Sequence, residues 1–112
     1  MENTEEIIEI LSDEQSREII NVLSKAELTI QQVSSLLNIP QSTSYRKIRK
    51  LEEMKIIKKT KVVRTLEGMD ESYYKNWTYE ITITFRDGKL FHNLEHVKME
   101  DKIVRMWQKF SE

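Results

Sequence analysis

The stretch Thr29–Lys50, TIQQVSSLLNIPQSTSYRKIRK, contains two short helical patterns separated by a tight break. Thr29 is placed to cap the first helix. Asn38 tolerates a left-handed turn and Pro40 pushes the residue before it out of the helical region, so the first pattern ends between them. Pro40 also suits the start of the next helix. Two helices joined in this way form a helix-turn-helix, and the side chains predicted to be buried in the first are Ile30, Val33, Leu36 and Leu37.

The second of these helices, predicted to end near Met54, has two different faces. At 100° per residue, the arc predicted to face the core holds Ser44, Tyr45, Ile48, Leu51 and Glu52. The opposite arc holds Ser42, Thr43, Arg46, Lys47, Arg49, Lys50 and Glu53. Small hydroxyl residues near a helix start fit into a DNA major groove, and Arg and Lys further along reach guanine edges or phosphates. Cations are also common on solvated helix faces, so this face alone leaves both interpretations open.

The distribution of charge along the chain favours the nucleic-acid interpretation. The whole chain has a net charge of −1, but residues 41–64 contain nine Lys or Arg and only two acids. That segment therefore carries +7 and the remaining residues carry −8. A molecule polarised in this way presents one cationic face, which is the feature that attracts DNA.

Composition limits the other classes of function. The chain has 112 residues, which is enough for one domain with a single core, and we predict one domain over residues 1–112. It has no cysteine, so disulfides and thiolate metal sites are excluded. No stretch approaches the roughly 18–20 apolar residues of a membrane span, and the first residues are acidic where a signal peptide is basic. We therefore expect a cytoplasmic protein that does not bind membranes.

Apolar segments precede the helix-turn-helix. Ser12 is a candidate N-cap for a helix that runs to about Lys25, with Ile19, Ile20 and Leu23 on its apolar face. The segment before it is too apolar for a free tail, and we expect a helical turn or a short strand packed on the domain or on a partner chain. Its apolar residues are Ile7, Ile8, Ile10 and Leu11.

The pattern changes after Met54 to that of β-structure. Residues 56–66 are rich in β-branched side chains, and residues 67–70 form a turn. Apolar and polar residues alternate over 78–85, and Asp87-Gly88 is a strong hairpin signal that pairs Phe85 with Leu90 and Ile81 with Leu94. A last helix is predicted over about residues 99–110.

Three helices followed by a β-ribbon is the order of a winged helix, an α+β and mainly helical fold. Residues 11–57 resemble the DNA-binding core of ArsR-like winged-helix transcriptional regulators, particularly small archaeal ones. The sequences ITFRDGKLFHNL and EDKIVRMWQKF near the end of the chain also resemble that group. In this chain Lys55 replaces the glycine common after the third helix, and the wing hairpin, residues 58–78, is longer than usual. The main points of similarity are Asp13, Arg17, Ile19, Ile20 and Leu23, residues 30–37, residues 41–46 and residues 51–54.

The resemblance implies that the third helix reads the major groove of double-stranded DNA and that the wing contacts the minor groove or the backbone. We predict that bases are read by Ser42, Thr43, Arg46 and Lys47. Phosphates are predicted to be bound by Arg49, Lys50, Lys58, Lys59, Lys61 and Arg64. Together these expectations describe a sequence-specific transcriptional regulator.

The apolar residues of the last helix have a heptad-like spacing that predicts pairing with a second copy. We therefore expect residues 99–111 to form a dimerisation helix, so that the homodimer places two reading helices about 34 Å apart over a pseudo-palindromic site. The predicted interface consists of Ile7, Ile8, Leu11, Met99, Ile103, Met106, Trp107 and Phe110.

Other chemistry finds little support in the sequence. His92 and His96 are too few ligands for a metal site, so no metal or cofactor is expected. Paired catalytic groups and phosphate-binding loops are absent, which argues against an enzyme. An alternative function is a winged-helix module that binds a protein through its wing. Whether an effector ligand exists is left open. Four aromatic residues could stack on bases, but we expect them to cover the core instead: Tyr73, Tyr74, Trp77 and Tyr79.

Overall fold

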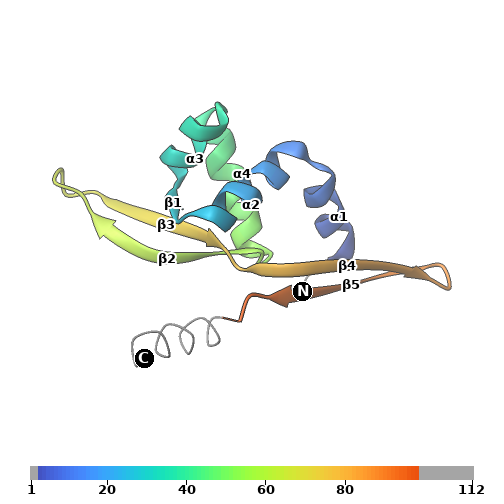
Figure 1. The fold of residues 1–112 in the computed structure, drawn as a ribbon. Helices are drawn as coiled ribbons and strands as arrows, with labels where there is room; N and C mark the ends of the chain where they lie inside the picture. Colours follow the sequence, from blue (N-terminus) through green and yellow to red (C-terminus); the bar gives the residue numbers. More distant parts are fainter. Residues whose placement is uncertain (1–2, 99–112) are drawn as a thin grey trace, which may run out of the picture.

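The computed structural model describes residues 3–98, which form four helices and five strands (Figure 1). The result is an α+β fold with antiparallel hairpins, consistent with a winged helix. The predicted helix over 99–110 lies outside the described residues. In chain order the elements are α1 (Thr4–Ser12), α2 (Glu14–Lys25), β1 (Leu28–Thr29), α3 (Ile30–Leu37), α4 (Gln41–Glu53), β2 (Ile57–Arg64), β3 (Asp70–Asn76), β4 (Thr78–Arg86) and β5 (Lys89–His96).

The helix-turn-helix formed by α3 and α4 is held by local interactions that the sequence predicts. Thr29 caps α3 in a reciprocal capping box with Gln32, which satisfies the first free amides of the helix. Asn38 ends α3 with a positive φ of 53°, and Pro40 precedes α4 as its N-cap. The Ser34 hydroxyl donates to the carbonyl oxygen of Ile39 across the turn, at 2.5 Å. The predicted turn and both helix starts are therefore confirmed.

Two β-sheets extend from the helical part in opposite directions (Figure 1). The wing, β2 and β3, forms a three-stranded antiparallel sheet with β1, and a bulge interrupts the pairing between Lys59 and Lys61. The second sheet is the β4–β5 hairpin, in which Phe85 pairs with Leu90 and Ile81 with Leu94, as predicted. Its turn residues Asp87 and Gly88 both have positive φ, at 54° and 74°, as a tight two-residue hairpin turn requires.

The core lies where α1, α2, α3 and α4 meet the base of the wing. Leu36, predicted to be buried, is 63% exposed. In this eight-residue helix Ile30 and Leu37 lie on one side of Val33 and Leu36 lies on the other, so only the first side turns toward the core. The buried hydrophobic residues are Ile7, Ile10, Ile19, Leu23, Val33, Ile48, Leu51, Met54, Ile56, Ile57 and Tyr74.

The segment before the predicted first helix is itself the helix α1. Asp13, rather than Ser12, is the N-cap of α2, since its carboxylate accepts a hydrogen bond from the Ser16 amide at 3.1 Å. Ser12 is instead the last residue of α1. Ile7 is fully buried in the core, which corrects its assignment to a dimer interface because the side chain has no surface left to offer a partner. Ile8 and Leu11 remain partly exposed.

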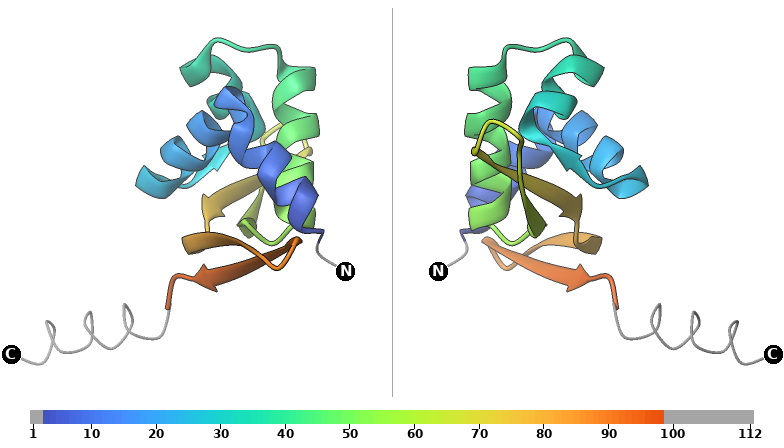
Figure 2. Two further views of the ribbon diagram at one scale, coloured as in Figure 1. Left: turned by 90° about the vertical axis from the view of Figure 1, so that its right-hand side faces the viewer. Right: turned by 90° about the vertical axis from the view of Figure 1, so that its left-hand side faces the viewer.

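Helix α1 also fixes the position of the β4–β5 hairpin beneath it (Figure 2). The Thr4 hydroxyl and the Nδ1 atom of His92 are hydrogen-bonded at 2.6 Å. At the base of the hairpin, His96 stacks on Trp77 and its Nε2 atom contacts the Lys55 carbonyl oxygen at 2.9 Å. Within residues 3–98, no helix combines the length and apolar character needed to span a membrane.

Candidate nucleic-acid interface

Helix α4 presents its polar arc to the outside of the molecule, as the sequence predicts. Ser44, Ile48 and Leu51 are fully buried, while Ser42 and Arg46 are exposed. Their positions on one helix follow from the helical period of the pattern. The exposed members of the arc form a polar surface along the helix, whereas Thr43 and Lys47 of the same arc are partly buried.

Tyr45, predicted on the buried arc, is 53% exposed and corrects that expectation. It lies at the edge of the arc, and the guanidinium of Arg49 sits over its ring, 5.8 Å from the centroid. The pair forms a cation–π contact on the outer surface of α4. An aromatic ring at this position adds a stacking surface to the candidate interface.

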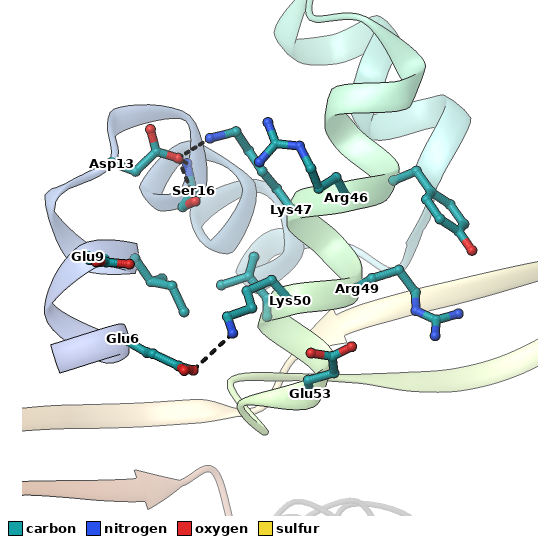
Figure 3. Close-up of a pocket in the computed structure, with 12 residues that line it drawn as sticks. Glu6, Glu9, Asp13, Ser16, Arg46, Lys47, Arg49, Lys50 and Glu53 are labelled. Atoms are coloured by element: carbon teal, nitrogen blue, oxygen red, sulfur yellow. Dashed lines mark hydrogen bonds and ion pairs between the residues drawn. The ribbon is translucent and has the colours of Figure 1, made fainter. Parts of the chain in front are cut away.

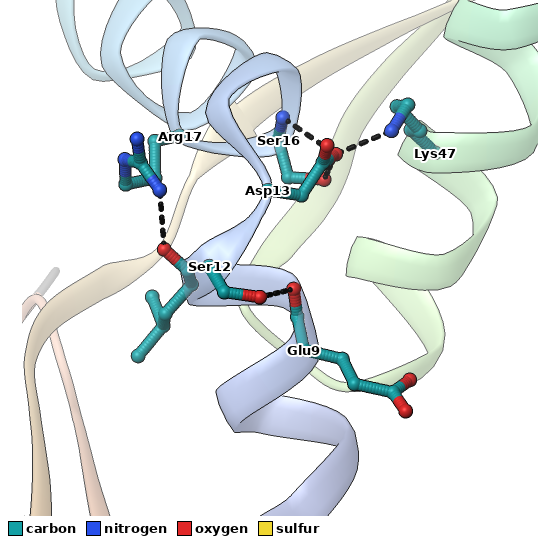
Figure 4. Close-up of polar contacts among 7 residues, drawn as sticks. Glu9, Ser12, Asp13, Ser16, Arg17 and Lys47 are labelled. Carbon is teal, nitrogen blue, oxygen red and sulfur yellow. Dashed lines mark hydrogen bonds and ion pairs between the residues drawn. The ribbon is translucent and has the colours of Figure 1, made fainter.

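Lys47 is not a free cation of this surface. Its ammonium donates to the Asp13 carboxylate, and its side chain is only 14% exposed (Figure 4). The same carboxylate accepts hydrogen bonds from the amide and hydroxyl of Ser16. The hydrogen bond from Lys47, followed by that from the Ser16 hydroxyl, lowers the pKa of Asp13 from 3.8 to about 2. The predicted base-reading role of Lys47 therefore competes with a strong contact inside the protein.

Lys50 also meets a carboxylate of α1. Its ammonium lies 2.9 Å from Glu6 Oε2, and both side chains remain partly exposed, at 45% and 41%. The hydrogen bond to Glu6 raises the pKa of Lys50 above its ordinary value. Figure 3 shows the resulting groove, in which Glu6, Glu9 and Asp13 face Lys47 and Lys50 across the space between α1 and α4.

The two arginines of α4 differ from its lysines. Among the described residues, Arg46 and Arg49 form no ion pair, and both are exposed. In Figure 3 Arg49 points away from α1. Arg46 and Arg49 are thus the cations of α4 that remain available to an external anion.

The wing also has both cations with internal contacts and cations that remain available. Lys58 lies over the Trp77 ring at 5.2 Å, and Lys61 lies over the Tyr73 ring at 4.7 Å. Lys61 also approaches Glu27 at 3.7 Å. Lys59 and Arg64 are exposed and form no ion pair within the described part of the chain. The structure thus places all four on the wing but leaves only these two uncommitted.

The aromatic residues and the histidines singled out in the sequence lie in different environments. Tyr74 is buried in the core as predicted, whereas Tyr79 is 71% exposed and corrects that expectation. A bulge between Thr78 and Glu80 takes Tyr79 out of the regular alternation of β4. His92 and His96 bind Thr4 and the Lys55 backbone, and among residues 3–98 no group of three or more potential ligands could hold a metal ion.

The residues that sequence reasoning missed are the acids of α1 and Asp13. Glu6, Glu9 and Asp13 are spaced three and four apart, which places acids at successive turns on one side of a helix. This spacing is the sequence signal that could have identified the acids as a group. Which helix the acids face depends on packing between distant segments.

Comparison with known proteins agrees with this geometry. Residues 13–59, under half of the chain, match the family model described as bacterial regulatory protein, arsR family. No curated protein matches the chain. The matched segment begins at the N-cap of α2, includes the α3–α4 turn and ends in the first residues of β2. This match makes residues 13–59 similar to a helix-turn-helix domain of the arsR type, which is a DNA-binding domain of transcription regulators.

Proposed function

We propose that this protein is a sequence-specific transcriptional regulator that inserts α4 into the major groove of double-stranded DNA. The observation that carries the proposal is the exposed arc of α4, where Arg46 follows the small residues Ser42 and Thr43. Small side chains let the helix approach the base edges, and arginine makes bidentate contacts to guanine. Thr43 is partly buried, so its hydroxyl contributes at the margin of this surface.

Phosphate contacts come from the cations that no acid of the described chain holds. Arg49 on α4 and Lys58, Lys59 and Arg64 on the wing meet this condition, and Arg49 and Lys58 each lie over an aromatic ring. Lys50 and Lys61 are part of the proposed phosphate surface as well, but each must give up or share its contact with a carboxylate. With about four phosphate contacts per protomer, a dimer is expected to give a slope of log affinity against log salt near −7.

The proposed active form is a homodimer on a pseudo-palindromic site. Residues 99–111 are proposed as its main contact on the basis of their heptad-like spacing, and Ile8 and Leu11 are proposed as further contacts. The β4–β5 hairpin, which leads into that segment, exposes Phe85 by 71% and Phe91 by 44%. Such exposed aromatic surface supports contact with another chain.

Selection from a random pool of DNA duplexes tests this function. The purified full-length protein is expected to enrich one motif with two inverted halves spaced by about one helical turn. Sedimentation of the protein alone is expected to show a dimer at micromolar concentration. Enrichment of a single half-site by a monomer contradicts the dimer but keeps the DNA-binding function. Failure to enrich any motif, by protein whose fold is verified by circular dichroism, contradicts the function itself.

The tip of the wing favours a second candidate function, binding of a protein partner through the wing. Leu66 is fully exposed and Met69 is 67% exposed, and Glu67 and Asp70 beside them are anionic. An apolar and acidic tip suits a basic protein surface better than phosphate. Retention of DNA selection after Leu66→Ser with Met69→Ser is expected under the DNA-binding proposal. The alternative is supported by two results together: the wild-type protein selects no DNA, and it forms a stable complex with a protein that the Leu66→Ser, Met69→Ser variant no longer forms.

A further inference from the structure

The contacts of α4 with Glu6 of α1 and with Asp13 reproduce the contacts that lysines make with DNA phosphates. Lys50 meets a carboxylate oxygen of Glu6 at 2.9 Å, and Lys47 meets one of Asp13. A carboxylate, like a phosphate, offers anionic oxygens to an ammonium group. Both lysines lie on the arc of α4 that the proposed function assigns to DNA. Protein anions therefore occupy lysines on which DNA phosphates would otherwise act.

Helix α1 is fixed in this position. Ile7 and Ile10 anchor it in the core, with 0% and 7% of their surfaces exposed. Only Asp13 separates α1 from α2, and Arg17 Nη1 donates to the Leu11 carbonyl oxygen at 2.7 Å across this junction (Figure 4). Moving α1 away from α4 would expose buried apolar side chains. The backbone that carries these acids is therefore fixed beside the lysines.

We infer that Asp13 and Glu6 set the selectivity of the DNA-binding surface by holding Lys47 and Lys50, so that these lysines add little to binding of arbitrary sequences. This inference rests on the proposed function. Phosphate contacts strengthen binding to all sequences alike, whereas contacts to base edges discriminate among them. With the lysines held by protein carboxylates, Arg46 makes a larger relative contribution. The expected consequence is a lower affinity for random DNA and a larger ratio of specific to non-specific binding.

The two lysines are held to different extents. Lys47 is 14% exposed, and the Asp13 carboxylate that it contacts is also held by Ser16. Asp13 therefore holds Lys47 more firmly than Glu6 holds Lys50. Glu6 and Lys50 are both exposed by more than 40%, where ion pairs are weak and salt-sensitive. The effect of removing Asp13 is therefore expected to exceed that of removing Glu6.

Binding of the full-length protein to a random-sequence duplex, measured over a range of salt concentrations, tests this inference. Asp13→Asn removes the charge but keeps a good N-cap for α2. We expect Asp13→Asn to bind the random duplex several-fold more tightly, with a salt slope steeper by about 0.9 for each lysine released. Glu6→Gln is expected to change both in the same direction by less. Glu18→Gln, which removes an exposed acid of α2 with no ion pair in the described chain, is the matched control.

A second substitution separates release of Lys47 from a general change in charge. Adding Lys47→Gln to Asp13→Asn restores the net charge, and the double variant is expected to return to the wild-type affinity and slope. If Asp13→Asn and Glu6→Gln bind as wild type does, or gain no more than Glu18→Gln, the inference is wrong although the protein binds DNA. If neither the wild type nor any folded variant binds duplex DNA at low salt, the proposed function fails instead.

Discussion

Asp13 makes three contacts through one carboxylate, two to α2 and one to α4. It caps α2, accepts a hydrogen bond from the Ser16 hydroxyl at 2.6 Å and pairs with Lys47 of α4. A capping aspartate needs only the first of these contacts. The other contacts convert a local helix signal into a link between α4 and the helices before it.

The lowered pKa of Asp13 makes a specific prediction for acid unfolding. Because the pKa is about 2 in the fold and 3.8 in the unfolded chain, the fold favours the carboxylate. The resulting stability is fully present above about pH 4 and is lost as pH falls toward about 2. Thermal melts from pH 6 to pH 2 are expected to show the advantage of the wild type over Asp13→Asn shrinking in this window. An advantage that stays constant with pH would contradict the assignment.

Lys55 occupies a backbone position that suits glycine. It follows α4 with a positive φ of 62°, where a Cβ atom is strained. The backbone thus keeps the conformation common after this helix even though the side chain departs from glycine. Lys55→Gly is expected to raise the free energy of unfolding by about 0.5–1 kcal/mol, after the greater freedom of glycine in the unfolded chain is allowed for.

Chemical denaturation measures this change, and Lys55→Ala is the control. Alanine removes the charged side chain but keeps the strained Cβ, so it should give no such gain. The contact between His96 Nε2 and the Lys55 carbonyl oxygen involves only the backbone of Lys55, so both variants retain it. Equal stabilisation by glycine and alanine would indicate that the side chain, not the backbone strain, is the cause.

Ser44 supplies a third test at the level of one side chain. It is fully buried in α4, and its hydroxyl has no hydrogen-bond partner within the described structure. Burying an unpaired hydroxyl costs roughly 1–3 kcal/mol. Ser44→Ala is expected to leave the protein as stable as the wild type or more stable in urea denaturation. A marked loss of stability would show that the hydroxyl has a partner in solution.

Among the elements, those with local signals were predictable from sequence. Thr29 and Asn38 fix the ends of α3, and Asp87-Gly88 fixes the β4–β5 register, because each acts through its own backbone conformation. The position of α1 was not predictable, since its contacts depend on packing between segments distant in sequence. Asp13 and Lys47 are 34 residues apart, and no periodicity relates them.

Sequence patterns also do not predict the exposure of residues at the edge of a helix's apolar face. Leu36 and Tyr45 lie near the edges of their apolar arcs, so the neighbouring elements decide whether they are covered. For the candidate site, the polar arc of α4 was predictable from composition and period. Which cations of that arc are paired was not, because the acids come from another helix.

The separation of roles between α4 and the wing predicts two different mutant phenotypes. Arg46→Ala removes the proposed base contact and should cost about 1–3 kcal/mol on the preferred sequence while relaxing specificity. Lys59→Ala removes a proposed phosphate contact and should weaken binding to all sequences alike. Titrations of each variant with the selected and a scrambled duplex distinguish these outcomes. If Arg46→Ala weakens both duplexes equally, its role in reading bases is wrong.

At the scale of the whole molecule, charge is segregated although the total is only −1. Residues 41–64 carry +7, and part of that charge is balanced across the groove by Glu6 of α1 and by Asp13. Within residues 41–64 as the structure describes them, exposed cations without an ion pair include Arg46 and Arg49 on α4 and Lys59 and Arg64 on the wing, which supports one orientation of the protein toward DNA. We therefore expect that one face, made by the outer arc of α4 and the wing, meets the nucleic acid.

Amide chemical-shift mapping by NMR, with the full-length protein titrated with a random-sequence duplex at low salt, shows which face binds. We expect the largest shifts on residues 41–50 and on the exposed part of β2, including Lys59 and Arg64. The β4–β5 hairpin, beneath α1, should change little. Shifts concentrated on β4–β5 with α4 unaffected, or no shifts at any duplex concentration, would show that this face does not bind DNA.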